Sequence, residues 1–150
     1  MVTIENFGKE MCAVALIGKN LLTTPGLMGP MGDSFSEKGI NIYSATPGKN
    51  RLTFFVDEKN REEAVKTAEE VSKTSSAIQN VGVEKSVGLV LVDLSDESWD
   101  IPGILGQLTG ALSQSGINII DISSSGPEIM LFVKYEDAKN ASDMLEQIYA

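Results

Sequence analysis

The sequence predicts an α+β chain of two similar domains, each an antiparallel four-stranded sheet with two helices on one face. Two observations lead to this prediction: the chain repeats itself, and each repeat alternates short apolar runs with segments of helical periodicity. With 150 residues, the chain is long enough for one ordinary domain or two small ones.

The internal repeat appears when the sequence is laid over itself with an offset of 77 residues and no gap. Twelve of the 73 aligned positions are identical, and eight of these twelve fall within one window of 18 residues. That window pairs Pro25-Gly26 with Pro102-Gly103, and residues 39–42 (GINI) with residues 116–119 (GINI). Unrelated segments rarely match in this way, so we interpret the chain as a duplicated domain.

Each repeat is predicted to run strand, helix, strand, strand, helix. Short apolar runs predict the strands, and apolar residues at helical spacing between a proline and a glycine predict the first helix. Pro30 lacks a backbone donor and is expected to restart or kink that helix. The predicted elements are 11–17, 25–39, 40–46, 51–57 and 59–73 in the first repeat, and 87–94, 102–116, 117–123, 128–135 and 137–149 in the second.

The fourth strand differs between the repeats. Residues 77–84 complete the first repeat, whereas the second repeat ends with its last helix. Residues 1–6 hold a spare strand, and a sheet edge without it would stay open. We therefore expect domains at 7–85 and 86–150, the second completed by residues 1–6. The resulting β-α-β-β-α-β order is the ferredoxin-like arrangement.

Composition excludes several classes of function. One cysteine, Cys12, and no histidine leave no disulfide framework, no cysteine-rich zinc site and no histidine base. The net charge of −9 argues against nucleic acid as a partner. No apolar stretch approaches the roughly 20 residues that span a bilayer, and the N-terminus lacks the layout of a signal peptide. We expect a cytoplasmic protein that is not an enzyme and has no cofactor.

An acidic loop separates the first two elements of the second repeat. Its carboxylates could hold a cation, but their spacing departs from the EF-hand pattern, so we expect no metal site. Trp99 in this loop is either a lid over a ligand or a packing residue. The acidic residues of the loop are Asp93, Asp96, Glu97 and Asp100.

The repeated residues resemble those of the ACT domain, a small amino-acid-binding regulatory module. In the first repeat the resemblance is carried by residues 13–18 (AVALIG), Pro25-Gly26-Leu27 and residues 39–42. Tandem copies with an exchanged strand are similar to the C-terminal regulatory region of aspartokinases over nearly the whole chain. The resemblance implies a homodimer that senses an amino acid effector, lysine or threonine, and modulates a catalytic kinase subunit. The alternative is an oligomerisation module with no small-molecule ligand.

The candidate ligand site lies where a Pro-Gly loop enters a helix. Backbone N–H groups and the helix dipole favour a carboxylate there, although the glycines could equally serve only tight helix packing. We favour the second copy, because residues 43–47 of the first copy lack its acid and its run of serines. The expected ligand-binding residues are Asp100, Ile101, Gly103, Ile104, Asn118, Ile119, Asp121 and Ser123 in the second copy, and Thr24, Gly26, Leu27 and Asn41 in the first.

Overall fold

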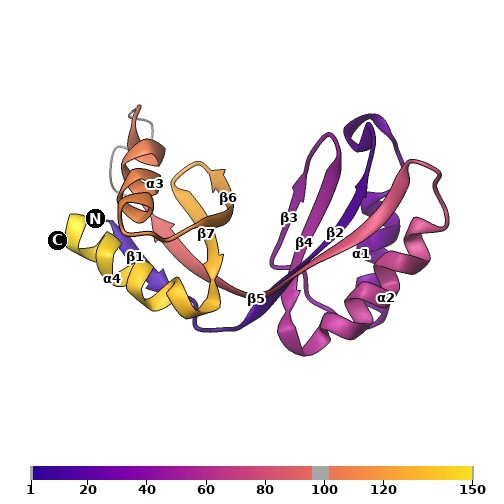
Figure 1. Cartoon of the computed structure of the whole chain (residues 1–150), viewed down its shortest axis with the longest axis horizontal. Coiled ribbons are helices and arrows are strands. Elements are labelled where there is room, and N and C mark those ends of the chain that lie inside the picture. The colour runs from indigo at the N-terminus through magenta and orange to yellow at the C-terminus, as the bar shows by residue number, and fades with distance from the viewer. Residues whose placement is uncertain (1, 96–101, 150) are drawn as a thin grey trace. The chain divides into compact units, whose positions relative to one another are not determined.

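The structure is a computed structural model that describes residues 2–95 and 102–149 (Figure 1). Short 3-10 helices span Leu21–Thr23, Glu58–Asn60 and Tyr135–Asp137. The strands are β1 (Thr3–Asn6), β2 (Met11–Gly18), β3 (Ser44–Pro47), β4 (Arg51–Asp57), β5 (Ile78–Asp93), β6 (Ile119–Ser125) and β7 (Glu128–Lys134), and the helices are α1 (Met28–Glu37), α2 (Arg61–Ser72), α3 (Ile104–Gln114) and α4 (Ala138–Ile148).

The chain forms two compact units. We call residues 11–85 the N unit, and residues 1–10 together with 86–150 the C unit. The N unit has the strand order β3-β4-β2-β5 with helices α1 and α2, and the C unit has the order β1-β5-β7-β6 with helices α3 and α4. Both units therefore have the predicted α+β, ferredoxin-like architecture.

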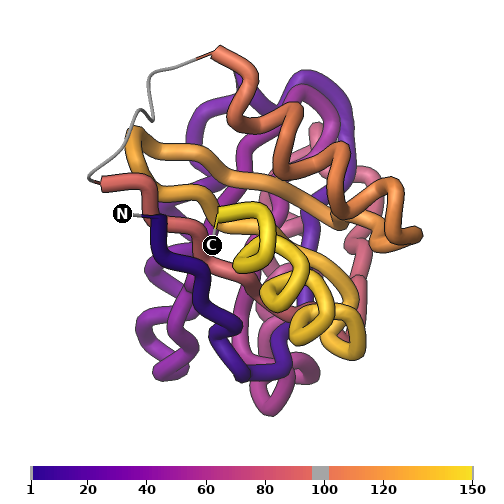
Figure 2. Tube along the Cα trace, turned by 90° about the vertical axis from the view of Figure 1, so that its left-hand side faces the viewer, coloured from indigo at the N-terminus to yellow at the C-terminus, as the bar shows by residue number. Residues whose placement is uncertain are grey.

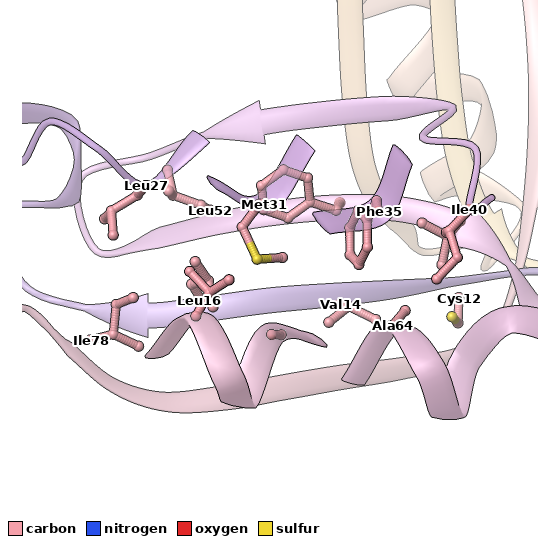
Figure 3. Close-up of a cluster of buried hydrophobic side chains, with 14 of the residues drawn as sticks. Cys12, Val14, Leu16, Leu27, Met31, Phe35, Ile40, Leu52, Ala64 and Ile78 are labelled. Carbon is pink, nitrogen blue, oxygen red and sulfur yellow. The ribbon is translucent and has the colours of Figure 1, made fainter. Parts of the chain in front are cut away.

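The core of the N unit lies between its sheet and its two helices. β2 and β4 pair antiparallel, with Val14 opposite Phe54, and the alternate residues of β2 face the helices. Figure 3 shows Met31 and Phe35 of α1 above this strand. The rings of Phe35 and Phe54 meet edge to face, with centroids 5.9 Å apart. This apolar packing, more than helix propensity, stabilises a helix as rich in glycine as α1.

The core of the C unit repeats this plan. β5 pairs antiparallel with β7, with Val90 opposite Leu131. Both side chains belong to the same buried cluster as Leu108 of α3 and Leu145 of α4. The neighbouring residues on each strand, such as Leu91 and Met130, point to the opposite face of the sheet.

The N-terminal strand completes the sheet of the C unit, as the sequence predicts. β1 pairs antiparallel with β5, from Thr3 opposite Asp93 to Asn6 opposite Val90. The pairing continues where the Phe7 N–H donates to the Leu89 carbonyl at 3.0 Å. Figure 2 shows this strand in indigo beside α4 in yellow, and the two elements are in contact.

Both first helices end in the same way. Gly39 and Gly116 have positive φ values of 69° and 76°. The N–H of the following isoleucine then turns back to the helix, from Ile40 to the Phe35 carbonyl at 2.8 Å and from Ile117 to the Leu112 carbonyl at 2.9 Å. This is the Schellman pattern of helix termination, and it explains why the repeated Gly-Ile pair follows each helix.

Several predictions differ from the structure. The strand expected at 40–46 is β3, Ser44–Pro47, because the N–H of Ile40 is used to end α1. The strands expected at 77–84 and 87–94 are one continuous strand, β5, which passes through Ser86 at a φ of 55°. Pro30 does not interrupt α1, because it stands at the third helical residue, where an N–H has no partner within the helix.

Candidate functional site

Each first helix begins at a glycine-containing loop. Gly26 and Gly103 have φ values of 84° and 103°, which L side chains rarely adopt. A Cβ atom added at either glycine would meet no atom within 4 Å. These glycines are therefore required by the backbone conformation of the loop, and the tight-packing explanation is not supported.

The start of α1 leaves backbone donors without helical partners. At this helix start the Met31 N–H donates to the Leu27 carbonyl at 3.3 Å. The N–H groups of Met28 and Gly29 precede it, and Pro30 has none. The side chain of the N-cap residue, Leu27, forms no capping hydrogen bond at this end of the helix. Gly29 also has open space where a Cβ would stand, so a ligand oxygen can approach its backbone closely.

A pocket of about 240 Å³ opens at this helix start within the N unit. Thr24 supplies its only hydroxyl group among the described residues, and that hydroxyl donates to the Asn20 carbonyl at 2.8 Å. The pocket has an apolar wall and no charged side chain among the described residues. Its lining residues are Leu21, Leu22, Thr24, Pro25, Gly26, Leu27, Met28, Gly29, Pro47 and Leu52.

Two large apolar side chains of this pocket are open to solvent. Leu22 is 59% exposed and Met28 is 42% exposed. A ligand or a protein surface that covered them would remove apolar area from water, which is worth roughly 25 cal/mol per Å². The arrangement suits a carboxylate at the N–H groups of α1 beside a small, uncharged body.

The structure brings together three of the four residues expected in the first copy. Thr24, Gly26 and Leu27 all line the pocket. Asn41 is exposed in the loop after α1 and is not among the lining residues. Sequence reasoning missed the pocket's walls. The apolar pair Leu21-Leu22, which lies outside the predicted strand and helix, was the available signal.

In the second copy, the loop before α3 is only partly described. Asp100 and Ile101 lie outside the described residues, as do Trp99 and two of the other loop carboxylates, Asp96 and Glu97. Gly103 is the N-cap residue of α3, and its carbonyl accepts a hydrogen bond from the Gln107 N–H at 2.9 Å. The N–H group of Ile104, at the first helical position, therefore precedes the helical ladder, as at the start of α1.

The polar residues expected on the second strand of this copy do not share one environment. Asn118 is exposed and precedes β6, while Ile119 packs against the core. Asp121 follows a β-bulge, and its Oδ1 accepts a hydrogen bond from the Ile122 N–H at 2.8 Å. Because Asp121 and Ser123 lie opposite Phe132 and Met130, they occupy the face of the sheet away from α3 and α4.

The remaining reactive groups have structural surroundings. Cys12 is fully buried, and burial is the main cause that raises the pKa of its thiol to about 12. Such a thiol stays protonated and unreactive near neutral pH. Among residues 2–95 and 102–149, no three His, Cys, Asp or Glu side chains are placed to hold a metal ion. Within the same residues, no helix is long and apolar enough to cross a membrane.

Comparison with known proteins agrees with the fold described above. Residues 83–147 match the sequence model of the ACT domain. A structure of aspartokinase α and β subunits superposes on 99% of this chain and 96% of its own, with a TM-score of 0.80 and 17% identity. The ligand-free regulatory subunit of aspartate kinase from Thermus thermophilus superposes on 99% of this chain and 97% of its own, with a TM-score of 0.76 and 19% identity. No curated protein sequence matches the chain.

The same fold also occurs within whole kinases. The aspartate kinase of Clostridium acetobutylicum superposes on 99% of this chain with a TM-score of 0.81 and 16% identity, but the match covers 34% of the kinase. The chain therefore has the ACT fold. Residues 83–147 match the ACT-domain model, and the whole chain has the fold of the regulatory regions of aspartokinases.

Proposed function

We propose that this protein is a regulatory module that binds an aspartate-pathway amino acid and modulates an aspartokinase-type catalytic partner, without catalysing a reaction itself. The observation that carries the proposal is the pocket at the start of α1, where free backbone donors meet an uncharged wall. The likeness to aspartokinase regulatory subunits supports the assignment of the partner.

The α-carboxylate of the effector binds at the first turn of α1. The N–H groups of Met28 and Gly29 donate to it, and the helix dipole adds partial positive charge. The hydroxyl oxygen of Thr24 has lone pairs left to accept a hydrogen bond from the α-ammonium group. Gly26 holds the loop in the conformation that exposes these donors.

The two units favour different side chains of the effector. The pocket of the N unit has no carboxylate among the described residues, so it suits a small neutral amino acid such as threonine. Asp121 in the C unit, together with the acidic loop that begins at Asp93, favours a cationic effector such as lysine. The other contacts that the sequence predicts for a lysine effector in the second copy are Asp100, Ile101, Gly103, Ile104, Asn118, Ile119 and Ser123.

The proposal includes a homodimer in the cytoplasm. Each ACT domain, at 7–85 and 86–150 with residues 1–6 added to the second, presents open sheet edges that a second copy can cover. Such an interface buries on the order of 1,200 Å² or more. Sedimentation that shows a strict monomer at micromolar concentration, with and without amino acids, contradicts the dimer.

Calorimetric titration with threonine, lysine and methionine tests the binding site. A Gly29→Leu variant fills the open space beside the pocket, and Gly32→Leu is its matched control, because Gly32 stands on the same helix outside the pocket. Threonine affinity is expected to fall at least tenfold in Gly29→Leu and to change less than twofold in Gly32→Leu. Equal losses of threonine affinity in the two variants contradict the proposed site.

The alternative function is an oligomerisation module with no small-molecule ligand. The exposed side chains of Leu22 and Leu105 near the two helix starts favour it, because a protein surface could bury them. Thermal unfolding with added amino acids separates the two functions. An effector at 100 times its dissociation constant stabilises the folded protein by about 2.7 kcal/mol, and an oligomerisation module shows no such shift.

A further inference from the structure

The negative charge of this protein is concentrated in one unit. The C unit contains three Lys+Arg and twelve Asp+Glu, whereas the N unit contains nine of each. The whole net charge of −9 therefore belongs to the C unit. A surface of this unit with an unmatched cluster of carboxylates would attract a cationic partner.

One such surface is a groove on the face of the C-unit sheet that points away from α3 and α4. It has a volume of about 250 Å³ and crosses the three strands β1, β5 and β7. We call it the acidic groove, because three of its side chains are carboxylates. Its lining residues are Thr3, Glu5, Leu91, Val92, Asp93, Glu128, Ile129 and Met130.

The strand register places charge around an apolar floor. Leu91 lies opposite Met130 in the β5–β7 pair, and on its other side it lies opposite Glu5 of β1. In the adjoining row Asp93 lies opposite Glu128. Glu5 and Glu128 are exposed, while Leu91 and Met130 are half-buried.

The facing carboxylates of Asp93 and Glu128 destabilise the folded protein. Like charges directly opposite each other on paired strands destabilise a sheet. Asp93 stays ionised, since hydrogen bonds from the side chain and backbone of Ser95 lower the pKa of its carboxyl. Within residues 2–95 and 102–149, which contain all twelve Lys and Arg, no Lys or Arg side chain forms an ion pair with Glu5, Asp93 or Glu128.

We propose that the acidic groove docks a lysine or arginine side chain presented by a partner protein. The aliphatic stem of such a side chain lies over Leu91 and Met130, as long basic side chains do on apolar surfaces. Its cationic head reaches Glu5 on one side or the Asp93–Glu128 pair on the other, and relieves the repulsion between those two carboxylates. This surface belongs to the C unit, and the proposal does not depend on the effector pocket of the N unit.

NMR titration of the full chain, labelled at its methyl groups, with two peptides tests the proposal. The probe is acetyl-Lys-Val-Lys-amide, and acetyl-Gln-Val-Gln-amide is the uncharged control. The lysine peptide is expected to shift the Leu91 and Met130 methyl signals saturably. Its affinity is expected to fall severalfold when the salt concentration rises from about 50 to about 300 mM. Equal shifts with both peptides, or none with the lysine peptide, overturn the proposal.

A pair of double variants separates the groove from general charge. The double variant Glu5→Gln with Glu128→Gln should bind the lysine peptide with at least fivefold lower affinity. Glu136→Gln with Glu146→Gln removes the same charge from exposed positions of the same unit, outside the groove, and should change the affinity less than twofold. Equal losses in the two double variants overturn the proposal. Binding of 1,5-diaminopentane tenfold tighter than the peptide overturns the protein partner in favour of a small diamine.

Discussion

Ile4 lies directly opposite Val92 in an antiparallel pair, and both side chains pack into the core of the C unit. The first residues of the chain thus belong to the same sheet as residues that follow the whole N unit in sequence. This pairing closes one edge of β5, whose other edge is occupied by β7.

Removal of residues 1–6 should therefore destabilise the C unit. β5 loses its partner strand, and Val90 and Val92 lose apolar cover from the N-terminal residues. Hydrogen exchange measured by mass spectrometry should show faster exchange in residues 86–94 and 128–134, with a smaller change in residues 51–57 of the N unit. Unchanged protection in β5 and β7 would count against the structural role of this strand.

Two glycine-to-alanine changes in the N unit should shift stability in opposite directions. A Cβ at Gly18 would stand 1.9 Å from the Ala77 carbonyl oxygen, so Gly18→Ala should lower the free energy of unfolding by about 1–3 kcal/mol. Gly32 lies within α1 with no atom near its Cβ position, so Gly32→Ala should raise it by up to about 1 kcal/mol. Urea titration of both variants measures the difference. Shifts of equal sign contradict the packing described at Gly18.

The end of α1 is tied to α2 through Lys38. Its Nζ donates to the fully buried Thr67 hydroxyl at 2.6 Å, and that hydroxyl donates to the Glu63 carbonyl. Lys38→Met should lower the free energy of unfolding by about 1 kcal/mol, because the Thr67 oxygen loses its donor. In Thr67→Val, which has no hydroxyl, the same Lys38→Met change should cost less. Equal costs in the two backgrounds, measured by a double-mutant cycle, would refute this link.

Cys12 should be unreactive in the folded protein. The pKa of about 12 leaves almost no thiolate at pH 8, so a thiol reagent should label Cys12 only after unfolding in guanidinium. The unfolded thiol ionises near pH 9 and the folded thiol does not, so unfolding releases a proton above that pH. Stability should therefore fall as pH rises from about 9 to 12, and Cys12→Ala should lack this part of the loss. Rapid labelling at pH 8 in the folded state would contradict this.

Much of the fold could be predicted from the sequence, because the repeat and the helix-ending glycines are local signals. Residues 51–57 form the predicted strand, and Gly39 and Gly116 end the predicted helices. The misplaced residues depend on backbone hydrogen bonds that periodicity does not reveal. Ile40 resembles a strand residue, but its N–H is committed to α1, and Ser86 adopts a left-handed conformation within β5.

The candidate site was less predictable. The helix start was visible in Pro25-Gly26, but the opposite wall of the pocket comes from Pro47 and Leu52 on the following strands. Contacts between segments so far apart in sequence follow from the sheet pairing, which places β3 beside β4. The face on which Asp121 lies also depends on a β-bulge, which shifts the alternation of side chains by one residue.

The central claim is that an amino acid binds at the start of α1, and methyl NMR of the wild-type chain tests it most directly. Threonine, lysine and methionine are added separately while the methyl signals of Leu22 and Met28 are followed. The account predicts a saturable shift of both signals with threonine, accompanied by little change at Leu91 and Met130. If no amino acid shifts Leu22 or Met28, the effector pocket is contradicted and the oligomerisation module is the better description.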